Sequence, residues 1–129
     1  MVTDEAVLEK LSLAKDKGSA FVKNAPLGIV VCVDPDKTDI WIEDASIASF
    51  TVLLAAESLG LGACWVQIRK RMHNSTEPAE PCITELLNLP QNLKVLSMIA
   101  IGYPAEEKAP HPKEKLQFEK IHRNIYDSK

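Results

Sequence analysis

The sequence predicts one layered domain of the α/β or α+β class, in which helices cover a sheet. Three apolar runs rich in Val and Ile, over residues 26–33, 63–68 and 94–102, predict buried strands. Segments with helical spacing of apolar residues lie between these runs. The chain has 129 residues, of which 46% are hydrophobic and 26% charged. This is the composition of a globular protein, so we expect a single domain over residues 1–129.

A first amphipathic helix is expected between Thr3 and Gly18. Thr3 is a suitable N-cap, and Asp4 and Glu5 place negative charge in the first turn, where the helix dipole favours it. Apolar residues then recur at helical spacing, namely Val7, Leu8, Leu11 and Ala14. Gly18 ends this run, and the strand over residues 26–33 follows.

The longest helix is expected over residues 42–59, which contain neither Gly nor Pro. Its apolar residues surround it almost completely, so we expect it to be a central helix buried on several sides. Small side chains would let a second helix approach closely, which predicts that part of this surface belongs to a second subunit. These small residues are Ala45, Ala48, Ser49, Ala55 and Ser58. Gly60 then ends the helix, because glycine takes a positive φ at no steric cost.

The second half of the chain continues the alternation. A loop is expected over residues 69–82, and a short helix over residues 83–90 that Pro90 ends. The strand over residues 94–102 leads into an arm rich in Pro and Lys. A short C-terminal helix carrying Phe118, Ile121 and Ile125 is expected after the arm.

Charge and composition exclude several classes of function. The net charge is −3, and the short basic run Arg69–Arg71 does not make the footprint of a nucleic-acid-binding protein. No apolar run approaches the roughly 18 residues that span a bilayer. With no secretory signal visible at Met1, we expect a cytoplasmic protein without a nucleic-acid or membrane partner.

Cysteine and histidine spacing argues against a metal site. The three cysteines form no C-x-x-C pair and stand mostly among apolar neighbours, which is typical of reduced core thiols. The three histidines, His73, His111 and His122, have neither ligand spacing nor a carboxylate companion. We therefore expect no metal and treat these histidines as surface residues.

The double-glycine segment at Gly60 and Gly62 does not match a nucleotide-binding loop. A dinucleotide fingerprint needs G-x-G-x-x-G between a strand and a following helix, whose N-terminus holds the pyrophosphate. Here the glycines end a helix, and a strand follows. No G-K-S or G-K-T tripeptide is present for a phosphate loop. A helix end is sufficient to explain the two glycines.

Four segments in a fixed order resemble the FMN-dependent nitroreductase family. They are APLGIVVCVD, WIEDASIASFTVLLAAESLGLGACWV, LLNLP and IAIGYP, and the similarity runs over residues 25–126. The resemblance implies an α+β fold with a helix-covered central sheet and a long central helix at the interface of a homodimer that binds FMN. It also implies ping-pong chemistry, in which NAD(P)H reduces the flavin and a nitro compound, quinone or similar small molecule then accepts the electrons.

The resemblance also assigns cofactor-binding positions, and it assigns no catalytic side chain. In the family, the strand after the glycines lies along the isoalloxazine ring, which matches Trp65, Val66 and Gln67. Basic residues after the last strand reach the FMN phosphate, which matches Lys113 and Lys115. The alternative is that Trp65 is a core aromatic residue, Gln67 a polar residue at a strand end, and the two lysines part of a solvated arm.

The family's N-terminal region has no counterpart in this sequence. That region carries an R-x-S-x-R-like segment for the FMN phosphate and a helix that shapes the dimer. We therefore expect the chain to be either a truncated form or a natural short form. The alternative function is a flavin-poor, non-catalytic dimerisation or scaffold module.

Overall fold

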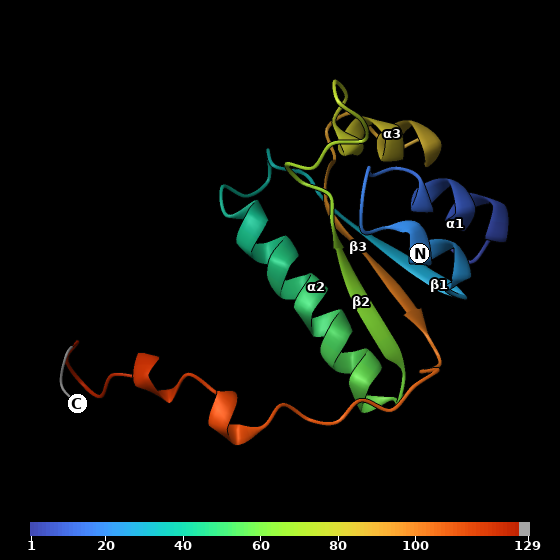
Figure 1. Cartoon of the computed structure of the whole chain (residues 1–129). Coiled ribbons are helices and arrows are strands. Elements are labelled where there is room, and N and C mark those ends of the chain that lie inside the picture. Colours follow the sequence, from blue (N-terminus) through green and yellow to red (C-terminus); the bar gives the residue numbers. More distant parts are fainter. Residues whose placement is uncertain (127–129) are drawn as a thin grey trace.

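A three-stranded antiparallel sheet forms the centre of the structure, a computed structural model that describes residues 1–126 (Figure 1). The strands are β1 (Leu27–Val33), β2 (Gly62–Gln67) and β3 (Lys94–Gly102), and they stand in the order β1-β3-β2. The central strand β3 is antiparallel to both neighbours and is buried from Val95 to Ile101. All three predicted strands are confirmed.

Helices cover both faces of the sheet. Helix α2 (Trp41–Ser58) contacts all three strands from one side, and α1 (Glu5–Ser12) and α3 (Ala79–Leu86) lie on the other side (Figure 1). Successive side chains of β3 point to opposite faces, as a strand requires. Ile99 therefore packs on the α2 side, and Met98 packs in the cluster that contains Leu8 of α1. This arrangement confirms the α+β class.

Helix α1 begins one residue later than expected, because Asp4 and not Thr3 is its N-cap. The Asp4 carboxylate accepts a hydrogen bond of 2.9 Å from the backbone N–H of Val7. This bond satisfies one of the amides that the first turn of a helix leaves without a partner. The helix ends at Ser12, and the 3-10 helix η1 (Ala20–Asn24) follows the loop at Gly18.

Only one face of α2 is covered by this chain, so the expected burial on several sides is not found within a single copy. Ala45, Ser49 and Ala56 face the sheet and are buried. Ala45 and Ser49 thus serve contacts within the chain and are not available to a second subunit, which corrects their assignment. The outer face carries the exposed apolar residues Ile47, Phe50 and Leu54.

Helix α3 begins inside the segment that we predicted to be a loop. Pro78 occupies its N-cap position and Pro81 lies in its first turn. The first-turn amides of a helix have no partner within the helix, so proline is tolerated there. The sequence reading took both prolines as signs of a loop and placed the start of the helix too late.

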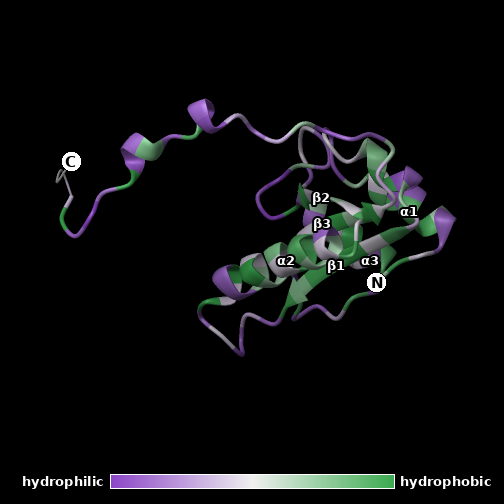
Figure 2. Cartoon of the chain, turned by 90° about the horizontal axis from the view of Figure 1, so that it is seen from below, coloured by the Kyte–Doolittle hydropathy of each residue, from purple (hydrophilic) through white to green (hydrophobic). Residues whose placement is uncertain are grey.

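After Tyr103 the chain leaves the body as an extended arm with two short 3-10 helices, η2 (Lys113–Lys115) and η3 (Phe118–Lys120) (Figures 1 and 2). The expected helix around Phe118 and Ile121 is wrong: no α-helix forms in the described residues 103–126. These side chains find no surface of this chain to pack on, and an isolated short helix is unstable in water. The helices in the described residues are all too short or too polar to cross a membrane.

Candidate functional site

The predicted cofactor residues Trp65, Val66 and Gln67 lie on an edge strand of the sheet. One side of β2 pairs with β3, and its other side pairs with no strand in residues 1–126. We call this other side the free edge of β2. An edge strand presents backbone N–H and C=O groups that still need partners. The free edge can therefore donate and accept hydrogen bonds from a ligand or from another chain.

The side chains of Trp65 and Gln67 are held by contacts within the chain. Both are half-buried and point to the α2 side of the sheet, like Ala63 of the same strand. The Trp65 Nε1 donates to Gln67 Oε1 at 3.0 Å, and Gln67 Nε2 donates to the backbone oxygen of Arg69 at 3.2 Å. Both polar atoms of the Gln67 amide are thus engaged within the chain. We therefore expect a cofactor to form its hydrogen bonds with the backbone of the strand and not with these side chains.

Val66 can contribute only its backbone to such a site. Its side chain points to the opposite face of the sheet, in the core cluster with Leu8 and Met98. Only 1% of its surface is exposed. The three residues therefore share one strand edge, and their side chains divide between the two faces.

A hollow of about 450 Å³ lies at the glycine end of β2. Its wall includes Cys64 on the strand, Tyr103 after β3, and Phe21 of η1. Trp65 is not among the residues that line it, so this hollow lies beside the start of the strand and not next to the indole. Cys64 is exposed, which corrects our expectation of a core thiol at this position.

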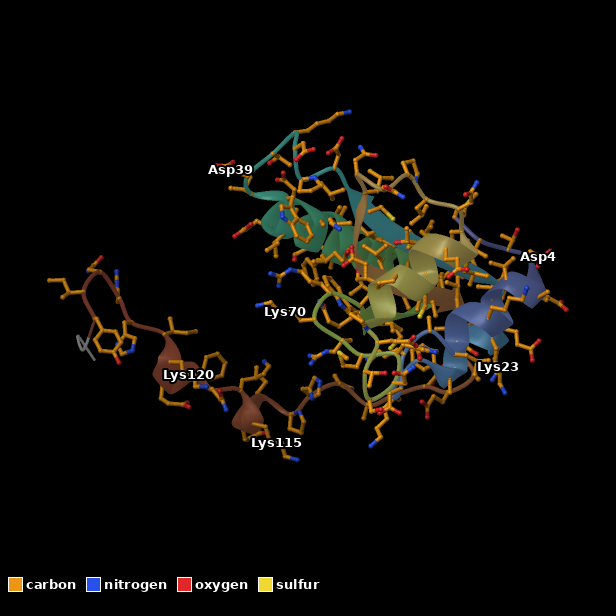
Figure 3. The ribbon with its side chains drawn as sticks, turned by 90° about the horizontal axis from the view of Figure 1, so that it is seen from above. Asp4, Lys23, Asp39, Lys70, Lys115 and Lys120 are labelled. Atoms are coloured by element: carbon orange, nitrogen blue, oxygen red, sulfur yellow. The ribbon has the colours of Figure 1, made fainter. Side chains whose placement is uncertain are left out.

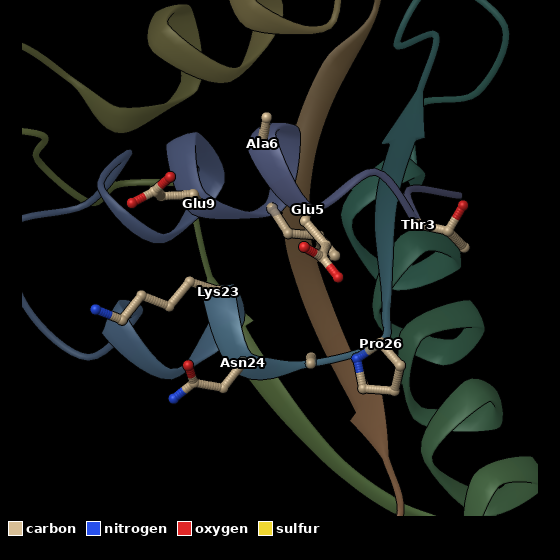
Figure 4. Close-up of a pocket in the computed structure, with 9 residues that line it drawn as sticks. Thr3, Glu5, Ala6, Glu9, Lys23, Asn24 and Pro26 are labelled. Atoms are coloured by element: carbon tan, nitrogen blue, oxygen red, sulfur yellow. The ribbon is translucent and has the colours of Figure 1, made fainter.

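A larger hollow of about 750 Å³ lies between α1 and η1 (Figure 4). Figure 4 shows Glu5 and Glu9 on α1 and Lys23 and Asn24 on η1 around it. No residue of β2 lines this hollow. It is therefore separate from the predicted cofactor strand, in spite of its size.

Lys113 and Lys115 lie on the arm and not beside β2. Both are exposed residues of η2, and Figure 3 shows Lys115 well away from the body of the chain. The structure of the single chain does not bring them to Trp65 and Gln67. Their assignment to the FMN phosphate stays a prediction.

The sequence reading missed a contact at the far end of β2. The guanidinium of Arg69 lies 5.6 Å from the centroid of the Trp41 ring, at a distance typical of a cation-π interaction. Trp41 is the first residue of α2, so this contact joins the helix to the end of the strand. The basic run after β2 was the available signal, and we weighed it only against nucleic-acid binding.

Burial affects the two cysteine thiols outside β2 and one histidine side chain. Burial raises the pKa of the Cys32 thiol above its ordinary value. Partial burial, together with the carboxylate of Glu77, raises the pKa of Cys82.

His73 is not the surface residue that we expected, because its Nδ1 is buried and has no hydrogen-bond partner in the described part of the chain. Residues 1–126 contain no group of three or more His, Cys, Asp or Glu side chains placed to hold a metal ion.

Comparison with known proteins identifies the family. The model of the nitroreductase family matches residues 2–103, which include the whole sheet and all three α-helices. The chain belongs to the nitroreductase family. This nitroreductase-family chain superimposes on an FMN-dependent nitroreductase from Clostridium difficile R20291 with a TM-score of 0.92. The two are 44% identical, and the match covers 97% of this chain and 73% of the other.

Two curated relatives are similar in sequence. A protein of Archaeoglobus fulgidus, named for an NADH dehydrogenase/NAD(P)H nitroreductase, is 38% identical over 112 residues, which are 84% of this chain and 61% of that protein. An FMN reductase [NAD(P)H] of Bacillus subtilis is 32% identical over 117 residues, which cover 74% of this chain and 44% of the relative. The nitroreductase-family chain thus spans less than two thirds of the length of these relatives.

Proposed function

We propose that this chain is the flavin-binding part of an FMN-dependent NAD(P)H oxidoreductase of the nitroreductase type. Its acceptor would be a nitro compound, a quinone or a similar small molecule. The observation that carries the proposal is the free edge of β2 at Trp65–Gln67, in a chain that shares its fold with an FMN-dependent nitroreductase. A nicotinamide donor is an intracellular metabolite, which supports the cytoplasmic location that we predicted.

The groups at the free edge suit a flavin. The isoalloxazine ring carries carbonyl oxygens and ring nitrogens that need hydrogen-bond partners, and an edge strand supplies N–H and C=O groups along one line. Bound FMN would supply the centre that accepts and releases hydride. The protein would hold the ring against the strand, with the side chains of Trp65 and Gln67 already fixed by their mutual hydrogen bond.

The phosphate of FMN needs cationic partners. Lys113 and Lys115 remain our candidates, since neither forms an ion pair with a carboxylate of residues 1–126. Lysine binds phosphate as a point charge, without the forked geometry of arginine. Because the arm lies away from its own body, these lysines would reach a flavin only after the arm docks on a body.

We also propose a homodimer. The outer face of α2 exposes Ile47 and Phe50 to solvent, and a contiguous apolar surface of this kind marks an interaction site. Ala48, Ala55 and Ser58 are exposed on the same helix and are small enough for a second helix to approach. A second copy would cover this face and give the apolar residues of the arm a surface to pack on.

The proposal is tested by adding FMN to the purified full chain, desalting it and recording the visible spectrum. We expect the flavin absorption bands to stay with the protein. Lys113→Glu should weaken FMN binding by roughly tenfold or more, because it replaces attraction to the phosphate with repulsion. Lys23→Glu is the control, since Lys23 of η1 lines the hollow between α1 and η1, to which neither β2 nor the arm contributes a residue (Figure 4).

The opposite results have distinct meanings. A colourless protein after desalting, with no FMN binding in a fluorescence titration, would contradict the flavin proposal and favour the non-catalytic dimerisation or scaffold module. Flavin retention with equal FMN affinity in Lys113→Glu would keep the flavin proposal and remove the arm from the site.

A further inference from the structure

Three consecutive cations follow β2, and we call Arg69–Arg71 the basic turn. The backbone N–H of Arg71 donates to the oxygen of Ile68 at 2.9 Å and closes the turn. Lys70 stands at its tip with a φ of 57°, in the left-handed region that lysine seldom adopts. The N–H of Arg69 donates to the oxygen of Leu96 at 3.0 Å, which ties the turn to β3. The three side chains thus project from a backbone held in one conformation.

The charges of the basic turn are not neutralised within the described chain. No carboxylate in residues 1–126 forms an ion pair with Arg69, Lys70 or Arg71. Two acidic residues at the ends of neighbouring elements have partners of their own. Asp34, which follows β1, accepts from Asn92 at 2.8 Å and lies 3.9 Å from Lys37 Nζ. Asp44, in the first turn of α2, accepts from Thr38 at 3.1 Å. The turn therefore concentrates three unpaired positive charges in a chain whose net charge is −3.

Arg69 is oriented before any ligand arrives. Its guanidinium carbon lies over the Trp41 ring, 5.6 Å from the ring centroid, which is a cation-π distance. No carboxylate of the described residues pairs with this guanidinium, and its fork of N–H donors matches two oxygens of a phosphate. This contact with Trp41 restricts the Arg69 side chain, so less conformational entropy is lost when a ligand binds.

The basic turn lies directly beyond the predicted cofactor strand. Arg69 follows Gln67 by two residues, which span at most about 7 Å. The hydrogen bond from Gln67 Nε2 to the backbone oxygen of Arg69 connects the two. A cofactor laid along the free edge of β2 would have one end at this turn.

We propose that the basic turn binds a phosphate monoester carried by a cofactor at the free edge of β2. This inference rests on the proposed function and adds a second cationic site to the arm lysines. Two cofactors of that reaction carry such a group, because FMN has a 5′-phosphate and NADPH a 2′-phosphate. Riboflavin and NADH lack it. Arg69 would bind two phosphate oxygens through its fork, and Lys70 and Arg71 would add point charges.

The test compares two pairs of ligands that differ only in the phosphate monoester. Binding of FMN and riboflavin, and of NADP⁺ and NAD⁺, is measured by isothermal titration calorimetry on the full chain. The variants are Arg69→Lys, which keeps the charge and loses the fork, and Lys70→Gly, which removes a charge and relieves the positive φ. Lys23→Gln is the control, since Figure 3 places Lys23 on the other side of the body from Lys70.

We expect Arg69→Lys and Lys70→Gly each to weaken the phosphorylated member of one pair by roughly tenfold to a hundredfold, with its partner unchanged. Loss confined to FMN assigns the turn to the flavin phosphate, and loss confined to NADP⁺ assigns it to the donor. Equal affinities of both variants and wild type for all four ligands overturn the inference, while binding of riboflavin and FMN keeps the proposed function. A wild-type chain that binds none of the four ligands overturns both.

Discussion

Single residues of this chain take their chemistry from exposure more than from sequence neighbours. Two of the three cysteines, Cys32 and Cys64, stand in similar apolar contexts along the sequence, yet the structure gives them different exposure. Cys64 is exposed near the glycine end of β2, and Cys32 and Cys82 are partly buried. Burial raises the pKa of Cys32 and of Cys82, so a smaller fraction of each is thiolate at neutral pH.

Alkylation should therefore reach Cys64 first. In the flavin-free chain at neutral pH, iodoacetamide should modify Cys64 faster than Cys32 and Cys82, because the thiolate is the reactive form and burial limits access. Raising the pH should accelerate alkylation of Cys32 and Cys82, since their raised pKa moves ionisation to higher pH. Peptide mass spectrometry over time measures all three rates, and Cys64→Ser is the control. Modification of Cys32 as fast as Cys64 would contradict this order.

The two glycines at the start of β2 should differ in their tolerance of alanine. Gly60 has a φ of 70°, so Gly60→Ala should cost about 1–2 kcal/mol of unfolding free energy. Gly62 has no such conformation, and a Cβ there would meet its nearest atom at 3.6 Å, an ordinary contact. Gly62→Ala is thus the matched control in urea unfolding. Equal stability losses would show that the backbone at Gly60 relaxes.

At the scale of elements, α2 has two apolar faces with different roles. The inner face packs on the sheet through small residues, which bring the helix close enough for a side-chain contact with β3. Ser49 Oγ lies 2.8 Å from Ser97 Oγ, and both residues are fully buried. Ser49 also donates to the backbone oxygen of Ala45 at 2.7 Å. One buried pair of hydroxyl groups thus connects α2 directly to the central strand of the sheet.

Replacing both hydroxyls should cost less than the sum of the two single replacements. Ser49→Ala leaves the Ser97 hydroxyl buried without its partner, at a cost of about 1–3 kcal/mol. In Ser97→Ala the Ser49 hydroxyl keeps the Ala45 oxygen, so only about 0.5–1.5 kcal/mol should be lost. The double variant leaves no unpaired hydroxyl. Urea unfolding of the four proteins completes the cycle, and additive losses would show that the pair is not coupled.

The whole molecule has two apolar features without a partner in its own chain. One is the outer face of α2, and the other is the arm, where Leu116, Phe118 and Ile121 are exposed. The outer face of α2 lies on the side of the sheet opposite α1 and α3, and the arm extends beyond the body (Figure 1). A second copy would cover both features, which is the assembly that we propose.

A charge on the outer face of α2 should prevent this assembly. Ile47→Glu would place a carboxylate in the proposed interface, so we expect a monomer in sedimentation velocity where the wild type is a dimer. Leu13→Glu is the matched control, because Ile47 and Leu13 are both 66% exposed and Leu13 caps α1 on the other side of the sheet. A wild-type monomer, or a dimer that survives Ile47→Glu, would contradict the proposed interface.

Much of the fold could be predicted because its signals are local. The strands and α2 are marked by apolar runs, and Gly60 marks a helix end, so their bounds were predicted within a few residues. The start of α3 was missed because Pro78 and Pro81 also occur in loops. The C-terminal helix was predicted from apolar spacing, but that spacing stabilises a helix only where another surface covers it.

Part of the candidate site could likewise be predicted from the sequence, and part could not. The order of residues along the chain was enough to place Trp65, Val66 and Gln67 on one strand, to identify the family, and to show three adjacent cations after that strand. Only the tertiary structure decided that β2 is an edge strand, that Arg69 lies over the Trp41 ring, and that η2 with its two lysines lies away from the body. Strand order and docking depend on contacts between segments far apart in sequence, which no local pattern of residues specifies.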